Sequence, residues 1–199
     1  LEQEVTNLRA AIEWCAEAEP ARGLRLLAGL RQFWFLRGYL SEARAWLAAL
    51  LADERAHAAE AYIRAQALVT AGLLAFHQGD LEAARKHSEA ALALSRATSD
   101  TRAEVDALFN LGGVAFYQND YAAAGTRFID CLERYRALGA LPEMALALKN
   151  LGLVAKDQGQ YVLAITYFSE SLTLAQQLGD RRGVAQGLFN LGVVAYWQS

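Results

Sequence analysis

The sequence predicts an all-α fold, a right-handed α-solenoid in which antiparallel pairs of helices stack into a superhelix. The main observation is one pattern that recurs four times at a fixed step, with copies that begin at Leu68, Leu108, Leu148 and Leu188. A second observation is that a glycine and an alanine keep their places in every copy, as Gly72, Gly112, Gly152 and Gly192, and as Ala75, Ala115, Ala155 and Ala195. The third is composition: only 2 of the 199 residues are proline and 54% are hydrophobic, which suits long, closely packed helices.

Residues 1–57 are expected to form an N-terminal helical segment. Residues 2–18 predict a lone helix, and residues 20–55 a degenerate repeat in which Arg31 stands where the first full repeat has Gly72. Aromatic residues concentrate in this segment: Trp14, Phe33, Trp34, Phe35, Tyr39 and Trp46. We interpret them as an aromatic core at this end of the array, and the alternative is a docking face for another domain.

Residues 58–199 are predicted to hold three full repeats and the first helix of a fourth. In the second full repeat, apolar residues spaced three or four apart predict one helix over 101–118 and another over 121–138. The chain begins with Leu1 rather than Met, and it ends inside the fourth repeat on an apolar helix. We therefore expect a piece of a longer protein, with self-association through the truncated last repeat as one consequence.

The glycines at a common register indicate a packing requirement. A glycine inside a helix costs about 1 kcal/mol relative to alanine, so four at one place need a compensating contact. We expect each to let a neighbouring helix approach closely, with Ala84, Ala124 and Ala164 fitting the same contact.

Charge and composition exclude several classes of function. A net charge of −3 and a pI near 5.7 give no basic footprint for nucleic acid. Cys15 and Cys131 lie far apart without a CxxC spacing, so buried free thiols are expected rather than a disulfide or a metal site. No apolar run could span a membrane and no signal peptide opens the chain, so a cytoplasmic location is expected. His57, His77 and His87 have no nucleophile or ligand set around them, so we expect no enzyme, cofactor or metal.

The repeated pattern resembles the tetratricopeptide repeat. That motif has a large apolar residue before Leu-Gly, a small or aromatic residue, a Gly-Asp-Tyr-like turn, and Ala and Phe on the second helix. The matching residues in the second full repeat are Leu108, Leu111, Gly112, Ala115, Asn119, Asp120, Tyr121, Ala124, Phe128 and Cys131. The common version has about 34 residues, so units of about 40 residues imply longer helices.

A narrower resemblance covers the N-terminal segment. Residues 7–14, 23–38 and 42–47 are similar to the start of the helical sensor arm in bacterial signal-transduction ATPases with numerous domains. Many of those proteins are LuxR-type or SARP-type transcriptional regulators, related in layout to MalT. The resemblance implies an ATPase module and a DNA-binding module elsewhere in the same full-length chain. The sequence contains no GxxxxGK[ST] loop and no helix-turn-helix signature, so the resemblance concerns context rather than local chemistry.

The tetratricopeptide resemblance also implies a groove, because the first helix of each repeat lines the concave face in that family. The groove would be aromatic at both ends with two lysines between, and its asparagines could pair with a peptide backbone. The candidate ligand-binding residues are Phe76, Phe109, Asn110, Phe116, Tyr117, Lys149, Asn150, Lys156, Phe189, Asn190, Tyr196 and Trp197. Two alternatives stay open: the asparagines bridge adjacent helices, or the aromatic residues are buried against the next repeat.

The sequence therefore predicts a binding scaffold. Our first hypothesis is the sensor arm of a multidomain bacterial transcriptional regulator, which binds a protein, a peptide with an acidic group near Lys149 and Lys156, or a small inducer. The alternative is a stand-alone adaptor that joins two proteins without a switching role.

Overall fold

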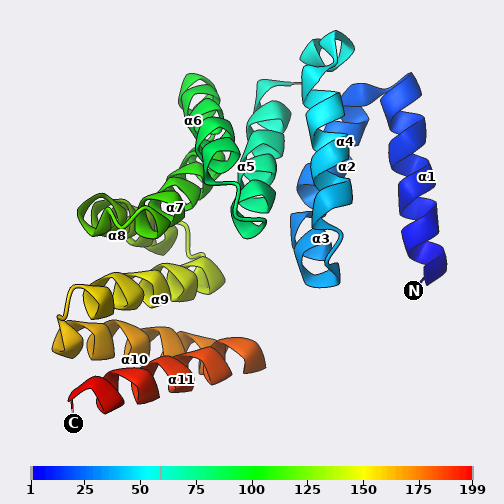
Figure 1. The fold of residues 1–199 in the computed structure, drawn as a ribbon. Coiled ribbons are helices and arrows are strands. Elements are labelled where there is room, and N and C mark those ends of the chain that lie inside the picture. Colours follow the sequence, from blue (N-terminus) through cyan, green and yellow to red (C-terminus); the bar gives the residue numbers. More distant parts are fainter. Residues whose placement is uncertain (1, 59, 199) are drawn as a thin grey trace. The chain divides into compact units, whose positions relative to one another are not determined.

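A computed structural model describes the backbone of residues 2–58 and 60–198, and the side chains of residues 4–56 and 60–197. All regular structure in this part of the chain is helical, which confirms the predicted all-α class (Figure 1). The helices gather into two compact units, residues 1–110 and 111–199, whose boundary falls inside one helix. The division predicted at residue 57 separates the N-terminal segment from the full repeats, whereas the boundary at residue 110 separates two compact units. The division at residue 57 therefore stays a prediction.

The first unit contains the lone helix, the degenerate repeat and the first full repeat. Its elements are α1 (Glu2–Ala18), α2 (Pro20–Gly29), α3 (Arg31–Arg37), α4 (Leu40–Ala52), the 3-10 helix η1 (Glu54–Ala58), α5 (Ala61–His77), α6 (Leu81–Thr98) and the start of α7 (Thr101–Tyr117). The lone helix is confirmed at both ends. The first helix of the degenerate repeat is broken at Leu30, whose φ of −100° and ψ of 17° depart from helical values.

The aromatic residues of this unit form a core around Trp34. Its side chain is fully buried, and its indole N–H donates to the carbonyl of Leu27 at 3.2 Å. Phe33 and Trp46 meet its ring edge to face, with centroids 4.9 Å and 6.0 Å away. Trp14 lies outside this core and is more than half exposed. The core interpretation is therefore confirmed for most of the cluster.

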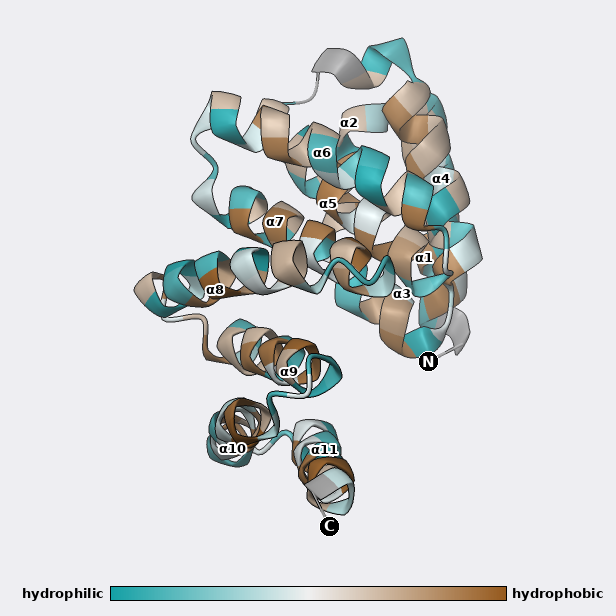
Figure 2. Cartoon of the chain, turned by 60° about the vertical axis from the view of Figure 1, so that its left-hand side comes forward, coloured by the Kyte–Doolittle hydropathy of each residue, from teal (hydrophilic) through white to brown (hydrophobic). Residues whose placement is uncertain are grey.

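The second unit continues the array with helices of nearly equal length. After the end of α7 come α8 (Tyr121–Ala137), α9 (Leu141–Asp157), α10 (Tyr161–Gln177) and α11 (Arg181–Gln198). Both helices predicted for the second full repeat are confirmed to within one residue. Helices α9, α10 and α11 lie side by side in chain order (Figure 1), and each has hydrophobic and hydrophilic sides (Figure 2). The hydroxyl of Ser171, late in α10, donates to the carbonyl of Ala145, early in α9, at 2.8 Å, so this pair is antiparallel.

The turns inside the first two full repeats combine a residue in the left-handed conformation with a capping aspartate. Gly79 ends α5 with a φ of 79°, and Asp80 then accepts a hydrogen bond from the backbone N–H of Ala83 at 3.0 Å. In the next repeat Asn119 takes the same left-handed place at a φ of 62°, and Asp120 is the cap. Asparagine tolerates this conformation better than most residues with a side chain, so the turn survives the loss of the glycine.

Three of the register glycines lie under a side chain of the following helix. A Cβ atom added to Gly112 would lie 2.7 Å from the ring of Phe128, and one added to Gly152 would overlap the ring of Phe168. At Gly72 it would lie 2.5 Å from the hydroxyl of Ser88. The close approach is therefore confirmed, but the residues that fill it stand four positions after the predicted alanines. Those alanines, Ala84, Ala124 and Ala164, are fully buried nearby.

We predict that Gly152→Leu lowers the melting temperature by several degrees. The ring of Phe168 is fully buried and has little room to move, and overpacking of this kind costs about 1–3 kcal/mol. Gly192→Leu is the matched control, because a Cβ at Gly192 meets no atom within 4 Å. Thermal unfolding followed by circular dichroism measures both. Equal melting temperatures for the two variants would contradict this packing role.

Candidate ligand-binding face

Lys149 of α9 is the central charged residue of the surface of the second unit that the sequence predicts to be the inner, ligand-binding face. The second and fourth repeats have Phe109 and Phe189 at this position and the first has Val69, so the sequence places an ammonium group where an apolar side chain is otherwise found. Lys149 is half-buried. Burial, together with the positive charge of Arg182 on α11, holds the pKa of the Lys149 amine below its ordinary value.

The two lysines of the predicted groove differ in their surroundings. Lys156 lies about two helical turns beyond Lys149, and it pairs with its neighbour Asp157, with Nζ 2.5 Å from Oδ1. Among the described residues no carboxylate pairs with Lys149. The charge of Lys156 is thus offset locally, whereas Lys149 has the like charge of Arg182 nearby. Arg182 is exposed, and the packing of α11 against α9 and α10 brings its charge near Lys149.

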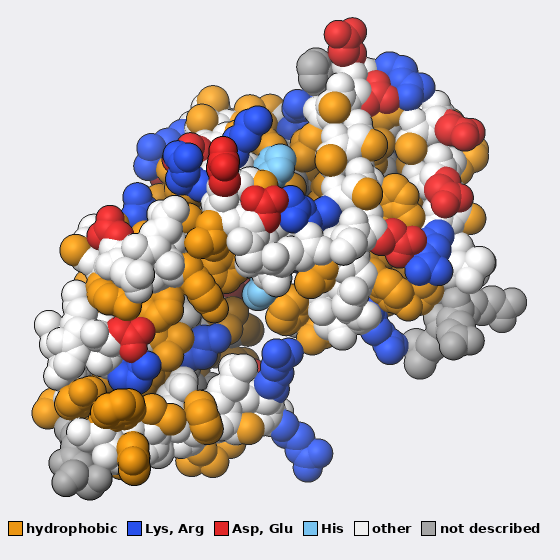
Figure 3. Space-filling view, viewed as in Figure 1, with side chains coloured by type: hydrophobic (Ala, Val, Ile, Leu, Met, Phe, Trp, Pro, Cys, Tyr) orange, Lys and Arg blue, Asp and Glu red, His pale blue; other side chains and the backbone are white. Residues whose placement is uncertain are grey.

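Exposed aromatic residues line one surface of α11. Phe189, Tyr196 and Trp197 are 70%, 76% and 63% exposed. With Leu188, Gly192 and Val193 they line an open apolar hollow of about 410 Å³. Figure 3 shows hydrophobic side chains gathered at the lower left, over the end of α11.

Three of the four remaining aromatic candidates are less open. Phe116 is half-buried and meets the rings of Tyr117 and Tyr121 edge to face, with centroids 5.8 Å and 5.6 Å away. Tyr117 is exposed, and Phe76 and Phe109 are half-buried. All four candidates keep some accessible ring surface, so they stay candidates.

The three asparagines differ in whether they bridge adjacent helices or remain candidates for binding a peptide backbone. Asn110 is buried, and its amide N–H donates to the carbonyl of Val69 at 3.0 Å, which ties α7 to α5 within the first unit. The helix-bridging alternative therefore describes Asn110, and one of its amide N–H groups is already used. Asn150 and Asn190 are half-buried and remain candidates.

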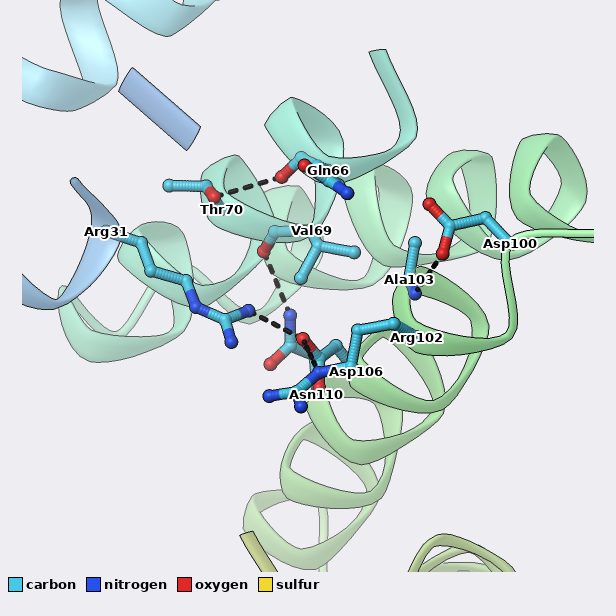
Figure 4. A network of polar contacts seen from close by, with 9 residues as sticks. All are labelled: Arg31, Gln66, Val69, Thr70, Asp100, Arg102, Ala103, Asp106 and Asn110. Carbon is cyan, nitrogen blue, oxygen red and sulfur yellow. Dashed lines mark hydrogen bonds and ion pairs between the residues drawn. The ribbon is translucent and has the colours of Figure 1, made fainter. Parts of the chain in front are cut away.

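A second polar site, in the first unit, could not be found from the sequence pattern. Asp106 of α7 is buried, and the guanidinium groups of Arg31 and Arg102 meet the same carboxylate oxygen at 2.6 Å and 3.3 Å (Figure 4). These residues border a hollow of about 280 Å³ that Gln66 and Thr70 also line. The one signal in the sequence is Arg31, which replaces the register glycine. The contact anchors the short helix α3 to α7.

We predict that Asp106→Ala destabilises the chain by roughly 1–3 kcal/mol, because two guanidinium groups lose a charged hydrogen-bond acceptor in a partly buried site. Glu89→Gln is the control: the Arg85–Glu89 pair is exposed and 3.5 Å long, and such pairs contribute little. Urea unfolding of both variants measures the difference. A loss for Asp106→Ala no larger than that for Glu89→Gln would remove the anchoring role.

The described residues contain no group of three or more His, Cys, Asp or Glu placed to hold a metal ion. Within the same part of the chain, no helix combines the length and apolar character that crossing a membrane requires.

The chain is similar to several known proteins. It is 37% identical over 76 residues to proteins named as putative HTH-type transcriptional regulators in Mycobacterium tuberculosis and Mycobacterium bovis. The match covers 37% of this chain and only 9% of those regulators.

Two solved structures share the fold. One is a Rap protein complexed with competence and sporulation factor, with a TM-score of 0.76 at 17% identity over 88% of this chain and 48% of that one. The other is a signal transduction ATPase with numerous domains that carries a tetratricopeptide repeat sensor, from Pyrococcus horikoshii. Its TM-score is 0.73 at 14% identity, over 97% of this chain and 30% of that one.

The tetratricopeptide repeat family model matches residues 63–137 and 143–199, which is well over half of the chain. The match includes nearly all of α5 to α11, the helices whose glycine register and capped turns are described above. The chain belongs to the tetratricopeptide repeat family.

Proposed function

We propose that this chain is the ligand-binding arm of a multidomain bacterial transcriptional regulator, and that the inner face of its second unit binds an acidic segment of a protein or peptide. The observation that carries the proposal is Lys149: a partly buried ammonium group with a like-charged neighbour and no acidic partner among the described residues.

Such an arrangement is unfavourable in the free chain. A cation that loses part of its hydration needs an anion or hydrogen-bond acceptors in exchange, and the approach of Arg182 adds repulsion. A carboxylate bound between the two side chains would offset both costs. Binding energy would then come from relief of an existing strain as well as from new contacts.

The surface beside this charge suits the rest of a peptide. Phe189 and Tyr196 present exposed rings on the same helix as Arg182, and apolar side chains of a ligand could cover them. Asn150 and Asn190 could pair with its backbone, since an amide group both donates and accepts. The ligand that fits best therefore combines an acidic residue with neighbouring apolar ones.

The regulatory context rests on the similarities. The matched Mycobacterium proteins are named as transcriptional regulators, and the Pyrococcus protein joins a repeat sensor to an ATPase. A ligand can shift such a regulator between two states only if it binds one of them more tightly. The alternative is an adaptor that uses the same face to join two proteins. A small inducer is a third kind of ligand for the arm.

We predict that Lys149→Met removes selectivity for acidic peptides while leaving the melting temperature unchanged or higher. Replacing a partly buried charge with an apolar side chain of similar size is often neutral or stabilising. The measurement is a peptide array in which each acidic decapeptide is paired with its Gln and Asn counterpart. Lys156→Met is the matched control, because Asp157 already offsets that charge, and it should keep the selectivity. The proposal fails if wild type shows no preference for the acidic members or if Lys149→Met retains it.

The regulator context has its own test. We predict that the complete open reading frame encodes a GxxxxGK[ST] loop and a DNA-binding module in the same chain. A frame with neither module would leave the adaptor, whatever the peptide array shows.

A further inference from the structure

The polar hollow of the first unit is a site apart from the ligand-binding face of the second unit. It measures about 280 Å³, and its lining comes from α2, α3, α5 and α7. The polar lining residues are Arg31, Gln66, Thr70, Arg102 and Asp106, and the others are two alanines and a valine. Ligand pockets commonly measure roughly 300–1,000 Å³, so this hollow has room for a small molecule.

The polar residues of the hollow depart from the repeat pattern. Arg31 stands where the full repeats have glycine, and Thr70 stands where the three later copies have asparagine. Asp106 is the one acidic residue at its place in the four copies, since the others have glutamine or leucine there. The packing that all repeats share therefore does not account for this cluster.

Two guanidinium groups share one carboxylate in the hollow. Nη1 of Arg31 lies 2.6 Å from Oδ2 of Asp106, and Nε of Arg102 lies 3.3 Å from the same oxygen. Arg102 and Asp106 are four residues apart on α7, so they form an ion pair of the usual helical kind without Arg31. Arg31 adds a second positive charge, and the residues that line the hollow thus carry one positive charge in excess.

Arg31 has donors beyond the one that Asp106 uses. A guanidinium group carries five N–H groups in a planar fork, and within the described part of the chain the structure gives the Arg31 side chain one acceptor. The side chains of Arg31 and Arg102 are 33% and 39% exposed, so a ligand in the hollow can reach both. Figure 4 shows them meeting Asp106 from two different helices. A second carboxylate would pair with another edge of the Arg31 fork in a charge-assisted hydrogen bond.

A buried hydroxyl group lies on the α5 side of the same hollow. Thr70 is 1% exposed, and its Oγ1 donates to the backbone carbonyl of Gln66 at 2.9 Å (Figure 4). A hydroxyl that donates in this way still has lone pairs that can accept a hydrogen bond. The exposed side-chain amide of Gln66 can donate and accept. A ligand with a hydroxyl group next to its anionic group would satisfy these residues.

We propose that the hollow binds a small hydroxycarboxylate. Its carboxylate pairs with Arg31 beside Asp106 and is attracted by the charge of Arg102, and its hydroxyl donates to Oγ1 of Thr70. The single positive charge in excess matches a monocarboxylate better than a phosphate monoester, which carries about −1.5 to −2 at neutral pH. The site uses neither Lys149 nor Arg182, so it stands or falls apart from the function proposed above.

The first test follows the melting temperature of the chain with lactate, glycolate, lactamide, propionate and glycerol 3-phosphate as probes. Lactate and glycolate should raise it saturably, because a ligand that binds the folded chain stabilises it. Lactamide lacks the charge, propionate lacks the hydroxyl, and glycerol 3-phosphate carries too much charge, so all three should act more weakly. The proposal is overturned if neither hydroxy acid raises the melting temperature, or if lactamide does so equally.

Variants then locate the site by isothermal titration with lactate. Arg31→Lys keeps the charge but loses the planar fork, so the Kd should rise at least about tenfold. Arg22→Lys is the matched control, because that guanidinium pairs with Glu19 near the surface, and it should bind as wild type does. Lys149→Met should also bind normally, which separates this site from the acidic-peptide face. Unchanged binding by folded Arg31→Lys would overturn the proposal.

A second variant covers the case in which Arg31→Lys does not fold. Thr70→Val replaces the buried hydroxyl by a methyl group, so it should lose most of the preference for lactate over propionate. An unchanged preference would overturn the proposal.

The carboxyl end of a peptide is the competing source of the same anion. Acetyl-Ala-Ala-Ala with a free carboxylate is compared with its amidated form in the same titration. Binding of the free-acid tripeptide that Arg31→Lys abolishes, in a chain that does not bind lactate or glycolate, would assign the hollow to a chain terminus and overturn the proposal.

Discussion

The packing of this protein depends on one contact, that of a helix glycine with a large side chain of the next helix. At Gly112 and Gly152 the rings of Phe128 and Phe168 take the space that a Cβ atom would need. The contact sets how closely the two helices of a repeat approach, and it recurs because the sequence repeats. A glycine here lowers the stability of its own helix by about 1 kcal/mol relative to alanine, but it allows a whole aromatic ring to be buried against the helix.

Much of the fold could be predicted because it follows from local sequence and its repetition. The repeat pattern located the helices of the second full repeat to within a residue, and the turn that it assigned to Asn119 and Asp120 lies between them. The break at Leu30 could not be predicted in the same way. Arg31, which follows the break, pairs with the buried carboxylate of Asp106, 75 residues along the chain, and the repeat pattern contains no sign of this tertiary contact.

The sequence could predict which candidate residues share one face of a helix, but not the charge environment of each residue. Helical spacing places Lys149 and Lys156 together, and the sequence treats them as equals. The structure separates them, because Asp157 offsets one charge while burial and Arg182 act on the other. Asn110 was also predicted as a binding residue from its chemistry, but in the structure its amide donates to the carbonyl of Val69. Both distinctions depend on distances between helices that no repeat pattern contains.

The proposed function depends on Lys149 being held in an unfavourable charged state until an anion binds. The most direct measurement is an NMR titration of the lysine side chains, with Lys149 assigned by its loss in Lys149→Met. In the free chain, its titration midpoint should lie below the ordinary lysine value of about 10.5. It should then rise when an acidic peptide binds, because a nearby carboxylate favours the protonated amine. A midpoint at the ordinary value in the free chain, unmoved by the peptide, would contradict this role of Lys149.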